Sequence, residues 1–199
     1  MQLKAVLTTL LFTLATSAGA ALQVGDPAPD FTGTDTRGAS QNLSDYRGKT
    51  VILEWTNHDC PYVRKHYDSG NMQQQQRDAT GQGAVWLSII SSAPGKQGHV
   101  TAAEADDLTA RRNAAPSAVI LDESGDIGRL YGAKTTPHMY IIDAEGDLVY
   151  MGGIDSISSS NPADIGKAVQ YVPEALARMS KGEPIGSSVT RPYGCSVKY

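Results

Sequence analysis

Cysteine is scarce in this sequence of 199 residues, which contains two of them, Cys60 and Cys195. Two cysteines are too few for a disulfide-dense miniature domain or for a zinc site of four cysteines. A basic surplus is also missing, because 17 Lys and Arg stand against 21 Asp and Glu, a net charge of −4. Dedicated nucleic-acid-binding proteins usually carry the opposite balance, so we expect no nucleic-acid partner. The motifs for phosphate-cradling loops and for H-E-x-x-H or G-x-S-x-G enzymes are likewise missing.

Long apolar runs are confined to the N-terminus. Lys4 precedes a mostly apolar stretch over residues 5–14, and an A-x-A cleavage signal follows at residues 18–20. This pattern is typical of a secretory signal peptide, and the stretch is shorter than the roughly 20 residues that span a membrane. We therefore predict a signal peptide over residues 1–20, cut near Ala20, and a periplasmic or secreted protein without stable membrane insertion. An uncleaved membrane anchor is the alternative.

The rest of the chain, residues 21–199, is expected to form one domain whose C-terminal tail carries Cys195. Apolar, β-branched runs predict strands over 50–55, 84–90, 117–122, 138–143 and 148–154. Helices are expected over 61–78, over 101–113 behind a capping box, over 127–131, and from Asn161 to about residue 179 with an interruption at Pro173. Alternating strands and helices predict a parallel sheet, and a hairpin at 144–147 adds antiparallel strands. The sequence thus predicts an α/β fold.

Cys60 is the candidate nucleophile. A short turn joins it to the strand over 50–55, and the following Pro61 suits the first turn of a helix. At a helix N-cap, unpaired N–H groups and the helix dipole favour a thiolate, which attacks disulfides or peroxides. Arg64, Lys65 and His66 add positive charge within the next two turns. The alternative is a structural cysteine.

Four segments carry a family resemblance in order along the chain. VILEWTNHDCPYV over 51–63 is similar to the strand and active-site turn of the thioredoxin superfamily, and Thr136-Pro137 to its cis-proline loop. GDPAPDF over 25–31 and LSDYRGK over 43–49 resemble segments of its redoxin branch, the AhpC/TSA or peroxiredoxin-like proteins. The resemblance implies a thioredoxin-like fold with a central mixed sheet flanked by helices. The tail RPYGCSVK over 191–198 is similar to a secreted subgroup of redoxin-like proteins.

The sequence departs from both active-site patterns of that superfamily. Val63 stands where W-C-x-x-C has its second cysteine, so this C-x-x-C motif is degenerate and no dithiol cycle runs between 60 and 63. Leu53 and Asn57 replace the Pro and the Thr or Ser of the peroxiredoxin pattern P-x-x-x-[ST]-x-x-C, with Thr56 one residue away. Thiol–disulfide exchange is therefore the leading function, and peroxiredoxin-like peroxide reduction, an antioxidant activity, is the alternative.

Cys195 is the remaining candidate partner for Cys60. As a resolving thiol it would attack a mixed disulfide or sulfenic acid on Cys60 and release the product. A structural disulfide that fixes the tail is the second interpretation, since such bonds are common in secreted domains. A third is that the two cysteines stay unpaired.

The resemblance also implies a substrate-binding surface. In the superfamily, the residue before the cis-proline offers main-chain groups to an extended substrate, which assigns that role to Thr136 and Pro137. We expect Trp55, Pro61 and Tyr62 to line the same surface, with a place in the core as the alternative for Trp55. The partners would be protein or small-molecule thiols and disulfides, peroxides under the alternative function, and an unidentified reductant.

A third hypothesis is a non-catalytic module that binds copper or a peptide at the same turn. Cys60 and His138 would be the metal ligands, because thiolate and imidazole both suit copper. Copper-delivery members of the family use a C-x-x-x-C pair, which is missing from this chain. We therefore expect neither a metal nor another cofactor.

Overall fold

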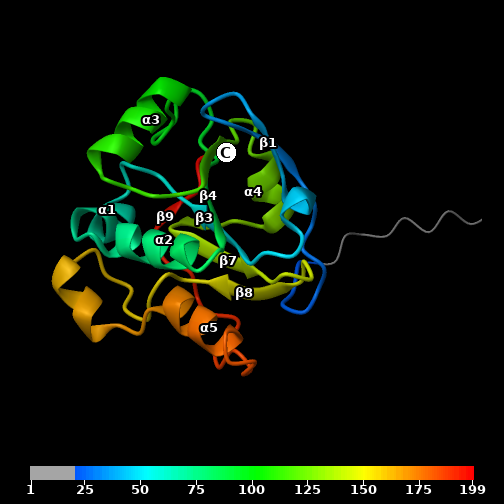
Figure 1. Ribbon diagram of the computed structural model, residues 1–199. Helices are drawn as coiled ribbons and strands as arrows, with labels where there is room; N and C mark the ends of the chain where they lie inside the picture. Colours follow the sequence, from blue (N-terminus) through cyan, green and yellow to red (C-terminus); the bar gives the residue numbers. More distant parts are fainter. Residues whose placement is uncertain (1–20) are drawn as a thin grey trace, which may run out of the picture.

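The computed structural model describes residues 21–199, which form a sheet with helices packed against it (Figure 1). The strands are β1 (Thr32–Asp35), β2 (Ser40–Asn42), β3 (Val51–Trp55), β4 (Val85–Ile90), β5 (Ala118–Leu121), β6 (Thr135–Thr136), β7 (His138–Ile142), β8 (Leu148–Gly152) and β9 (Cys195–Ser196). The helices are α1 (Pro61–Asp68), α2 (Asn71–Gly81), α3 (Ala102–Arg111), α4 (Asp126–Tyr131) and α5 (Tyr171–Met179), with 3₁₀ turns η1 (Leu43–Tyr46) and η2 (Pro162–Lys167). The predicted signal peptide, residues 1–20, lies outside the described residues.

The main sheet is mixed, in the order β2-β1-β5-β4-β3-β7-β8. β3, β4 and β5 run parallel, whereas β7 is antiparallel to β3 and β1 is antiparallel to β5. Residues of α1, α2 and α5 share one core cluster, and residues of α4 share the other, so helices cover both faces (Figure 1). This confirms the predicted α/β class with a central mixed sheet flanked by helices.

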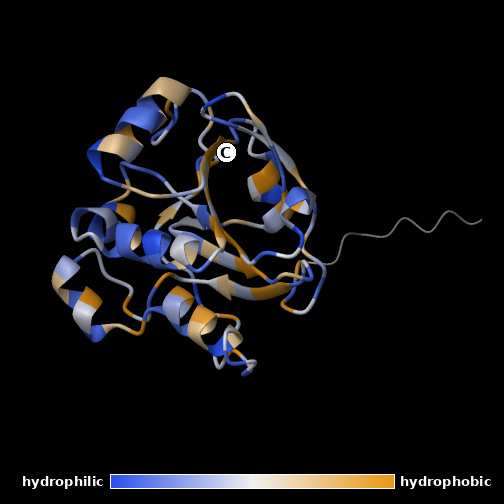
Figure 2. Ribbon diagram, in the orientation of Figure 1, coloured by the Kyte–Doolittle hydropathy of each residue, from blue (hydrophilic) through white to orange (hydrophobic). Residues whose placement is uncertain are grey.

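β3 is buried on both faces because helices cover both sides of the sheet. Leu53 and Trp55 point into one core cluster and Ile52 into the other, as the two-residue period of a strand requires. Burial on both faces explains why this strand has an almost continuous apolar sequence, and Figure 2 shows the same hydrophobic colour along the central strands. Cys60 packs in the cluster of Ile52, so the candidate site lies on the α1 side of the sheet.

The single helix predicted over 61–78 is two helices. α1 ends at Asp68, and Gly70 takes a left-handed conformation with φ of 77° before α2 begins at Asn71. Glycine enters this region without the steric cost that a Cβ imposes. The chain therefore turns at Ser69-Gly70, and α2 continues to Gly81, three residues beyond the predicted end.

The last predicted helix is also divided, but not at Pro173. Asn161 caps η2 as expected, its side chain accepting a hydrogen bond from the Ala163 N–H at 3.1 Å. Ala168 and Gln170 then adopt extended conformations, and α5 begins at Tyr171. Pro173 falls in the first turn of α5, where backbone N–H groups have no partner within the helix. Its missing N–H therefore costs nothing there.

Two local predictions are confirmed. Thr101 and Glu104 form the capping box at the start of α3, each side chain accepting the other's main-chain N–H. The turn over 144–147 joins β7 and β8, which pair antiparallel. Both features depend on residues close together in the sequence, which is why their patterns could be recognised there.

The C-terminal tail, residues 188–199, crosses the molecule from the sheet edge to the candidate site (Figure 1). It begins beside the edge strand β8, where Met151 donates to the Ser188 carbonyl at 3.0 Å and accepts from the Thr190 N–H at 3.1 Å. Farther on, β9 pairs antiparallel with β6. At its end the Tyr199 hydroxyl donates to the Ala133 carbonyl at 2.8 Å. The tail is thus bonded to the domain at its beginning, middle and end.

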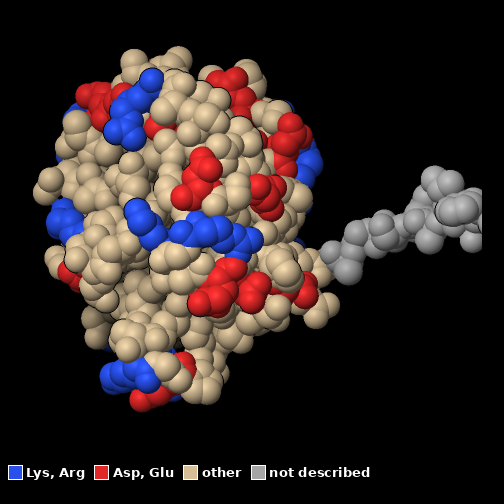
Figure 3. Space-filling model, turned by 45° about the vertical axis from the view of Figure 1, so that its right-hand side comes forward, with Lys and Arg blue, Asp and Glu red and all other residues tan. Residues whose placement is uncertain are grey.

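The surface carries charges of both signs. Figure 3 shows acidic and basic side chains interspersed on one face, in line with the small net charge of −4. No helix within residues 21–199 is both long enough and apolar enough to cross a membrane.

Candidate functional site

Cys60 occupies the N-cap of α1, as predicted. Its backbone is extended, with φ of −74° and ψ of 122°, and Pro61 is the first helical residue. The Cys60 carbonyl accepts the first helical hydrogen bond, from the Arg64 N–H at 2.9 Å. The free N–H groups of a helix N-terminus and the helix dipole favour negative charge at this position. The position suits a thiolate nucleophile.

The sulfur of Cys60 lies between the proline loop and the tail. Its S–H donates to the Thr136 carbonyl oxygen at 3.1 Å, and the Thr136–Pro137 peptide is cis, as the resemblance implied. From the other side the main-chain N–H of Cys195 donates to the same sulfur at 3.4 Å. The Cys60 side chain is 0% exposed. The Cys60 sulfur is therefore completely covered.

Cys195 reaches this place because the tail pairs with the proline loop. In the β6–β9 pairing, Cys195 lies opposite Thr136. Gly194 makes the approach possible, because a Cβ at this position would lie 2.0 Å from the Thr136 oxygen and its φ of 139° strains any other residue. The structure thus brings together two cysteines separated by 135 residues, both as free thiols.

The two thiols differ in environment. Cys195 is half-buried, whereas Cys60 is fully buried. Burial raises the pKa of the Cys195 thiol, and its hydrogen bond to Cys60 and the negative charge of that sulfur raise it further. Cys195 therefore keeps its proton more readily than an ordinary cysteine.

A buried polar cluster, the tail anchor, fixes the tail two residues before Cys195. It consists of Lys65 and His66 from α1, Asp155 beyond β8, and Tyr193 of the tail. Lys65 Nζ lies 2.8 Å from Asp155 Oδ2, and both side chains are 0% exposed. The Tyr193 hydroxyl donates to Asp155 Oδ1 in a very short hydrogen bond and accepts from Lys65 Nζ at 3.3 Å. An ion pair without solvent contact therefore holds the tail.

Two residues of the tail anchor, His66 and Tyr193, have pKa values displaced from their ordinary values. Burial lowers the pKa of His66 to about 4; the charge of Asp155 opposes this shift and that of Lys65 adds to it. Burial, followed by the hydrogen bond to Asp155, raises the pKa of Tyr193. His66 is therefore neutral at pH 7, and its Nε2 lies 3.3 Å from the Tyr193 hydroxyl.

Asp155 and Tyr193 were not identified from the sequence as site residues. The sequence predicted positive charge at Lys65 and His66 close behind Cys60, but His66 is neutral at pH 7 because burial lowers its pKa. Lys65 pairs with a carboxylate 90 residues away. The one sequence signal was the tail itself, since the motif that carries Cys195 also contains Tyr193.

Glu54 is a second buried charge that the sequence analysis missed. It lies in the middle of β3 with 0% exposure. Its Oε2 accepts hydrogen bonds from Trp86 Nε1 at 2.9 Å, Ser88 Oγ at 2.9 Å and Gln76 Nε2 at 3.2 Å, and its Oε1 accepts from the Tyr67 hydroxyl at 2.9 Å. Four donors satisfy the carboxylate, and its charge also raises the pKa of Tyr67, after burial as the main cause.

The residues predicted to contact substrate lie in different environments. Pro61 is exposed, and the half-buried ring of Tyr62 packs edge-on against Tyr193 with centroids 5.8 Å apart. Thr136 and Pro137 are buried, and the tail pairs with Thr136. Trp55 is a core residue, in contrast to the predicted place on the substrate surface: it is 0% exposed and its Nε1 donates to Ser91 Oγ at 3.0 Å. The tail therefore covers part of the surface that the sequence assigned to substrate, at Thr136 and Tyr62.

His138, the candidate copper ligand, is buried beside Tyr140. Its Nδ1 lies 3.3 Å from the Lys134 N–H and 3.2 Å from the Tyr140 hydroxyl. Burial, with a smaller contribution from the charge of Lys134, lowers the pKa of His138 to about 3. Within residues 21–199 no group of three or more His, Cys, Asp and Glu side chains could hold a metal ion.

Thr56, the residue nearest to the peroxiredoxin hydroxyl position, lines a cavity that Cys60 does not line. The cavity has a volume of about 40 Å³, and His58 and Arg112 also line it. Within the part of the chain that the structure describes, its Oγ1 has no hydrogen-bond partner. The hydroxyl therefore makes no hydrogen bond to the Cys60 sulfur.

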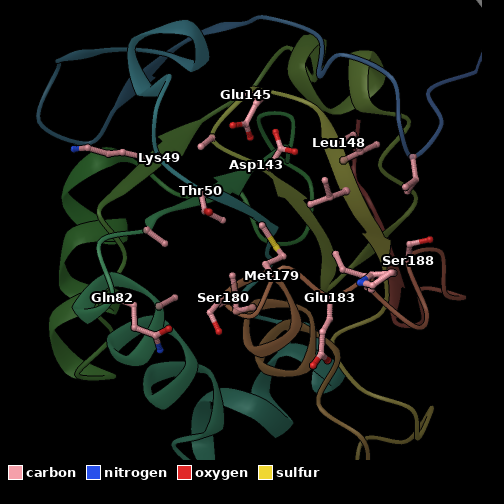
Figure 4. Close-up of a pocket in the computed structure, with 18 of the residues that line it drawn as sticks. Lys49, Thr50, Gln82, Asp143, Glu145, Leu148, Met179, Ser180, Glu183 and Ser188 are labelled. Atoms are coloured by element: carbon pink, nitrogen blue, oxygen red, sulfur yellow. The ribbon is translucent and has the colours of Figure 1, made fainter.

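A cavity of about 820 Å³ opens at the other end of the sheet, and Figure 4 shows most of the residues that line it. Thr50 precedes β3, and Lys49, Asp143 and Met179 complete one part of the wall (Figure 4). Cys60 follows the opposite end of β3, and neither cysteine lines this cavity. The hollow is therefore separate from the candidate site.

Comparison with known proteins agrees with this geometry. The chain is 27% identical over 135 residues to the thiol-disulfide oxidoreductase ResA of Geobacillus kaustophilus (strain HTA426), covering 64% of this chain and 68% of that protein. The structure of an uncharacterized conserved protein from Geobacillus kaustophilus superposes with a TM-score of 0.78 and 22% identity, covering 89% of this chain and 93% of that one. The exposed lipoprotein thioredoxin of Streptococcus pneumoniae strain TIGR4 superposes with a TM-score of 0.50 and 25% identity, covering 66% and 93%.

These similarities confirm the thioredoxin-like fold that the sequence resemblance implied. The AhpC/TSA family matches residues 24–151, a segment that runs from the lead-in before β1 through Cys60 and the cis-proline loop into β8. The match covers more than half of the chain. The protein therefore belongs to the AhpC/TSA family, the redoxin branch of the thioredoxin superfamily.

Proposed function

We propose that this protein is a thiol–disulfide oxidoreductase in which Cys60 is the nucleophile and Cys195 the resolving thiol. One observation carries the proposal: the N–H of Cys195 lies 3.4 Å from the sulfur of Cys60, so the two cysteines of the chain meet at a helix N-terminus. The name of the ResA relative, thiol-disulfide oxidoreductase, supports the same chemistry.

The reaction balances with these two sulfurs. The Cys60 thiolate attacks a substrate disulfide, forming a mixed disulfide and releasing one substrate thiolate. The Cys195 thiol then loses its proton to solvent and attacks the Cys60 sulfur, which releases the second substrate thiolate and leaves a Cys60–Cys195 disulfide. The substrate has gained two electrons, and the protein has lost two.

An external dithiol must then return those electrons. In the oxidised protein the half-buried Cys195 sulfur is the more accessible atom, and attack there expels Cys60 as a thiolate at its helix N-cap. Because Cys60 is fully covered in the reduced state, substrate entry requires the tail to leave β6.

The compartment belongs to the same proposal. Removal of residues 1–20 by a signal peptidase would place residues 21–199, as one domain, in a periplasmic or extracellular space. Disulfides persist in such spaces, so a disulfide reductase or exchanger would meet its substrates there. Peroxide reduction stays a prediction. Membership of the AhpC/TSA family favours it. The position of Thr56 does not, because Thr56 lines a cavity that Cys60 does not line.

Single-turnover reaction with an aromatic disulfide, whose thiolate product absorbs visible light, tests the roles. Reduced wild type is expected to release two thiolates per chain and to end as an intramolecular disulfide. Cys195→Ser is expected to release one thiolate and to keep the aromatic adduct on Cys60, identified by mass spectrometry. Cys60→Ser is expected to react at least tenfold more slowly.

Each serine variant can refute the role assigned to the cysteine that it replaces. If Cys60→Ser retained the rapid wild-type phase, Cys60 would not be the nucleophile. If Cys195→Ser still released two thiolates, Cys195 would not be the resolving thiol. Replacing the aromatic disulfide by hydrogen peroxide in the same series tests the peroxide alternative.

A further inference from the structure

We propose that Tyr193 is a positioning residue: through the buried Lys65–Asp155 pair it holds Cys195 at Cys60 and thereby sets the redox potential of the two cysteines. This inference rests on the proposed function. It assigns a role to the tail anchor, which the exchange chemistry itself does not use.

Helix α1 links Cys60 to the tail anchor. Cys60 is its N-cap, and Lys65 and His66 lie within its next two turns. The same rigid element therefore carries the nucleophile and the cation that receives the tail. On the tail side, Tyr193 precedes Cys195 by two residues, a span of roughly 7 Å in extended chain. A tail held at Tyr193 leaves Cys195 little freedom to move away.

Gly194 completes the geometry between the two tail residues. It lies directly against the Thr136 oxygen, which is the acceptor for the Cys60 S–H. β9 then pairs with β6 at the next residue, so Cys195 is fixed from both sides. The tail anchor and the β6 pairing together place the Cys195 N–H on the Cys60 sulfur.

The tail anchor is complete only while Tyr193 is in place. The Lys65 ammonium has three N–H donors, and its partners are Asp155 Oδ2 at 2.8 Å, the Ile157 carbonyl at 3.2 Å and the Tyr193 hydroxyl at 3.3 Å. Asp155 Oδ1 accepts from Tyr193 and from the Ile157 N–H at 3.0 Å. Withdrawing the tail removes one partner from each ion of a buried pair, which is costly.

Because withdrawing the tail is costly, the tail anchor keeps Cys195 near Cys60 and raises its effective concentration there. A group tethered close to its partner reacts as if its concentration were high, and loosening the tether lowers that concentration. The Cys60–Cys195 disulfide is consequently more stable with the tail anchor intact. The buried Lys65–Asp155 pair thus acts on the redox equilibrium although it touches neither sulfur.

Tyr193→Phe tests this role because it removes the hydroxyl and keeps the ring. In glutathione redox buffers, the equilibrium constant for forming the Cys60–Cys195 disulfide is expected to fall at least tenfold, a potential less negative by about 30 mV. Alkylation of Cys60 in the reduced protein is expected to accelerate at least fivefold. Tyr46→Phe is the matched control, since it removes a tyrosine hydroxyl bonded to Gln41, on the β1–β2 side, and should change neither value.

A double-mutant cycle with Asp155→Asn shows whether Tyr193 positions Cys195 through Asp155 or only stabilises the fold in general. If Tyr193 acts through Asp155, Tyr193→Phe should change the equilibrium constant for forming the Cys60–Cys195 disulfide less than threefold in the Asp155→Asn background. An unchanged or more negative potential in Tyr193→Phe, with the wild-type disulfide forming normally, would overturn the positioning role and leave the exchange function intact. A wild type that forms no Cys60–Cys195 disulfide would instead overturn the exchange function. A lower melting temperature without a shift in potential would mean a merely structural role.

Discussion

The main-chain N–H of Cys195 donates to the sulfur of Cys60 across 3.4 Å, although 135 residues separate the two cysteines. A thiolate at Cys60 is consequently met by a donor from its own partner and by the N-terminus of α1. The same contact closes the site, because the tail that supplies Cys195 occupies the edge of β6. The tail therefore both covers Cys60 and supplies a hydrogen-bond donor to its sulfur.

Gly194→Ala is expected to move the tail away from β6 and to expose Cys60. A Cβ would meet the Thr136 oxygen at 2.0 Å and would also strain a backbone with φ of 139°, so the tail must shift away from β6. We expect unfolding to become easier by about 2 kcal/mol, and Cys60 to be alkylated at least tenfold faster. Urea unfolding and a time course of alkylation followed by mass spectrometry measure the two effects.

Gly182→Ala is the control for backbone strain alone. Its φ of 68° is also unfavourable for alanine, but a Cβ there meets nothing within 4 Å. Its stability is expected to fall by about 1 kcal/mol while Cys60 stays protected. Equal acceleration of alkylation in both variants would contradict the role of the Gly194 contact.

Acid is expected to destabilise the fold through His66. Its pKa is lowered to about 4 in the folded protein, because burial opposes its charge, against about 6.5 in the unfolded chain. Between these values the unfolded chain binds the extra proton, so this contribution is complete above pH 6.5 and falls as the pH drops toward 4. Urea unfolding at pH 7 and pH 4.5 should differ by about 2 kcal/mol from His66 alone. His138, with a pKa of about 3, adds a change of the same sign.

A matched pair of variants checks the contribution of His66. His66→Gln should reduce the pH dependence between pH 7 and 4.5, whereas His99→Gln should not, because His99 lies in a partly exposed pair with Glu123. If the two variants showed the same pH dependence, buried neutral His66 would not be its source.

Glu54→Gln is expected to cost about 2 kcal/mol, because charge-assisted hydrogen bonds from Trp86, Ser88, Gln76 and Tyr67 become neutral ones in a buried site. Glu174→Gln is the surface control: its side chain is 41% exposed and its ion pair with Arg178 spans 3.4 Å. That variant should cost less than 1 kcal/mol. Chemical denaturation followed by circular dichroism compares them, and equal costs would contradict the importance of burial.

The sequence predicted those features whose physical causes are local. The strand at β3, the cap at Cys60 and the capping box at Thr101 each depend on neighbouring residues, and the structure confirms them. The division of the first helix also had a local cause, since Gly70 is an ordinary helix-ending residue that the periodicity of the flanking residues obscured. The division before α5 had a weaker signal, because Pro173 misleadingly pointed to a break inside that helix.

The tail anchor could not be predicted because its members come from distant segments. Lys65, Asp155 and Tyr193 belong to α1, to the segment after β8 and to the tail, and each is an ordinary polar residue in its own surroundings. Trp55 is a residue for which a local signal was misleading. Its position beside the active-site turn suggested a place on the substrate surface, but the alternation of side chains along β3 directs it into the core. Only the three-dimensional packing decides which of these residues meet.

A redox titration of residues 21–199, read by thiol alkylation and mass spectrometry, is the most direct test of the claim that Cys60 and Cys195 form an exchange pair. The proposed function predicts a disulfide between Cys60 and Cys195 with a midpoint above about −250 mV, in the range of catalytic thiol–disulfide pairs. A midpoint below about −300 mV would identify a structural bond that leaves no free nucleophile, and would contradict the claim. Two thiols that never join under oxidising conditions would contradict it as well.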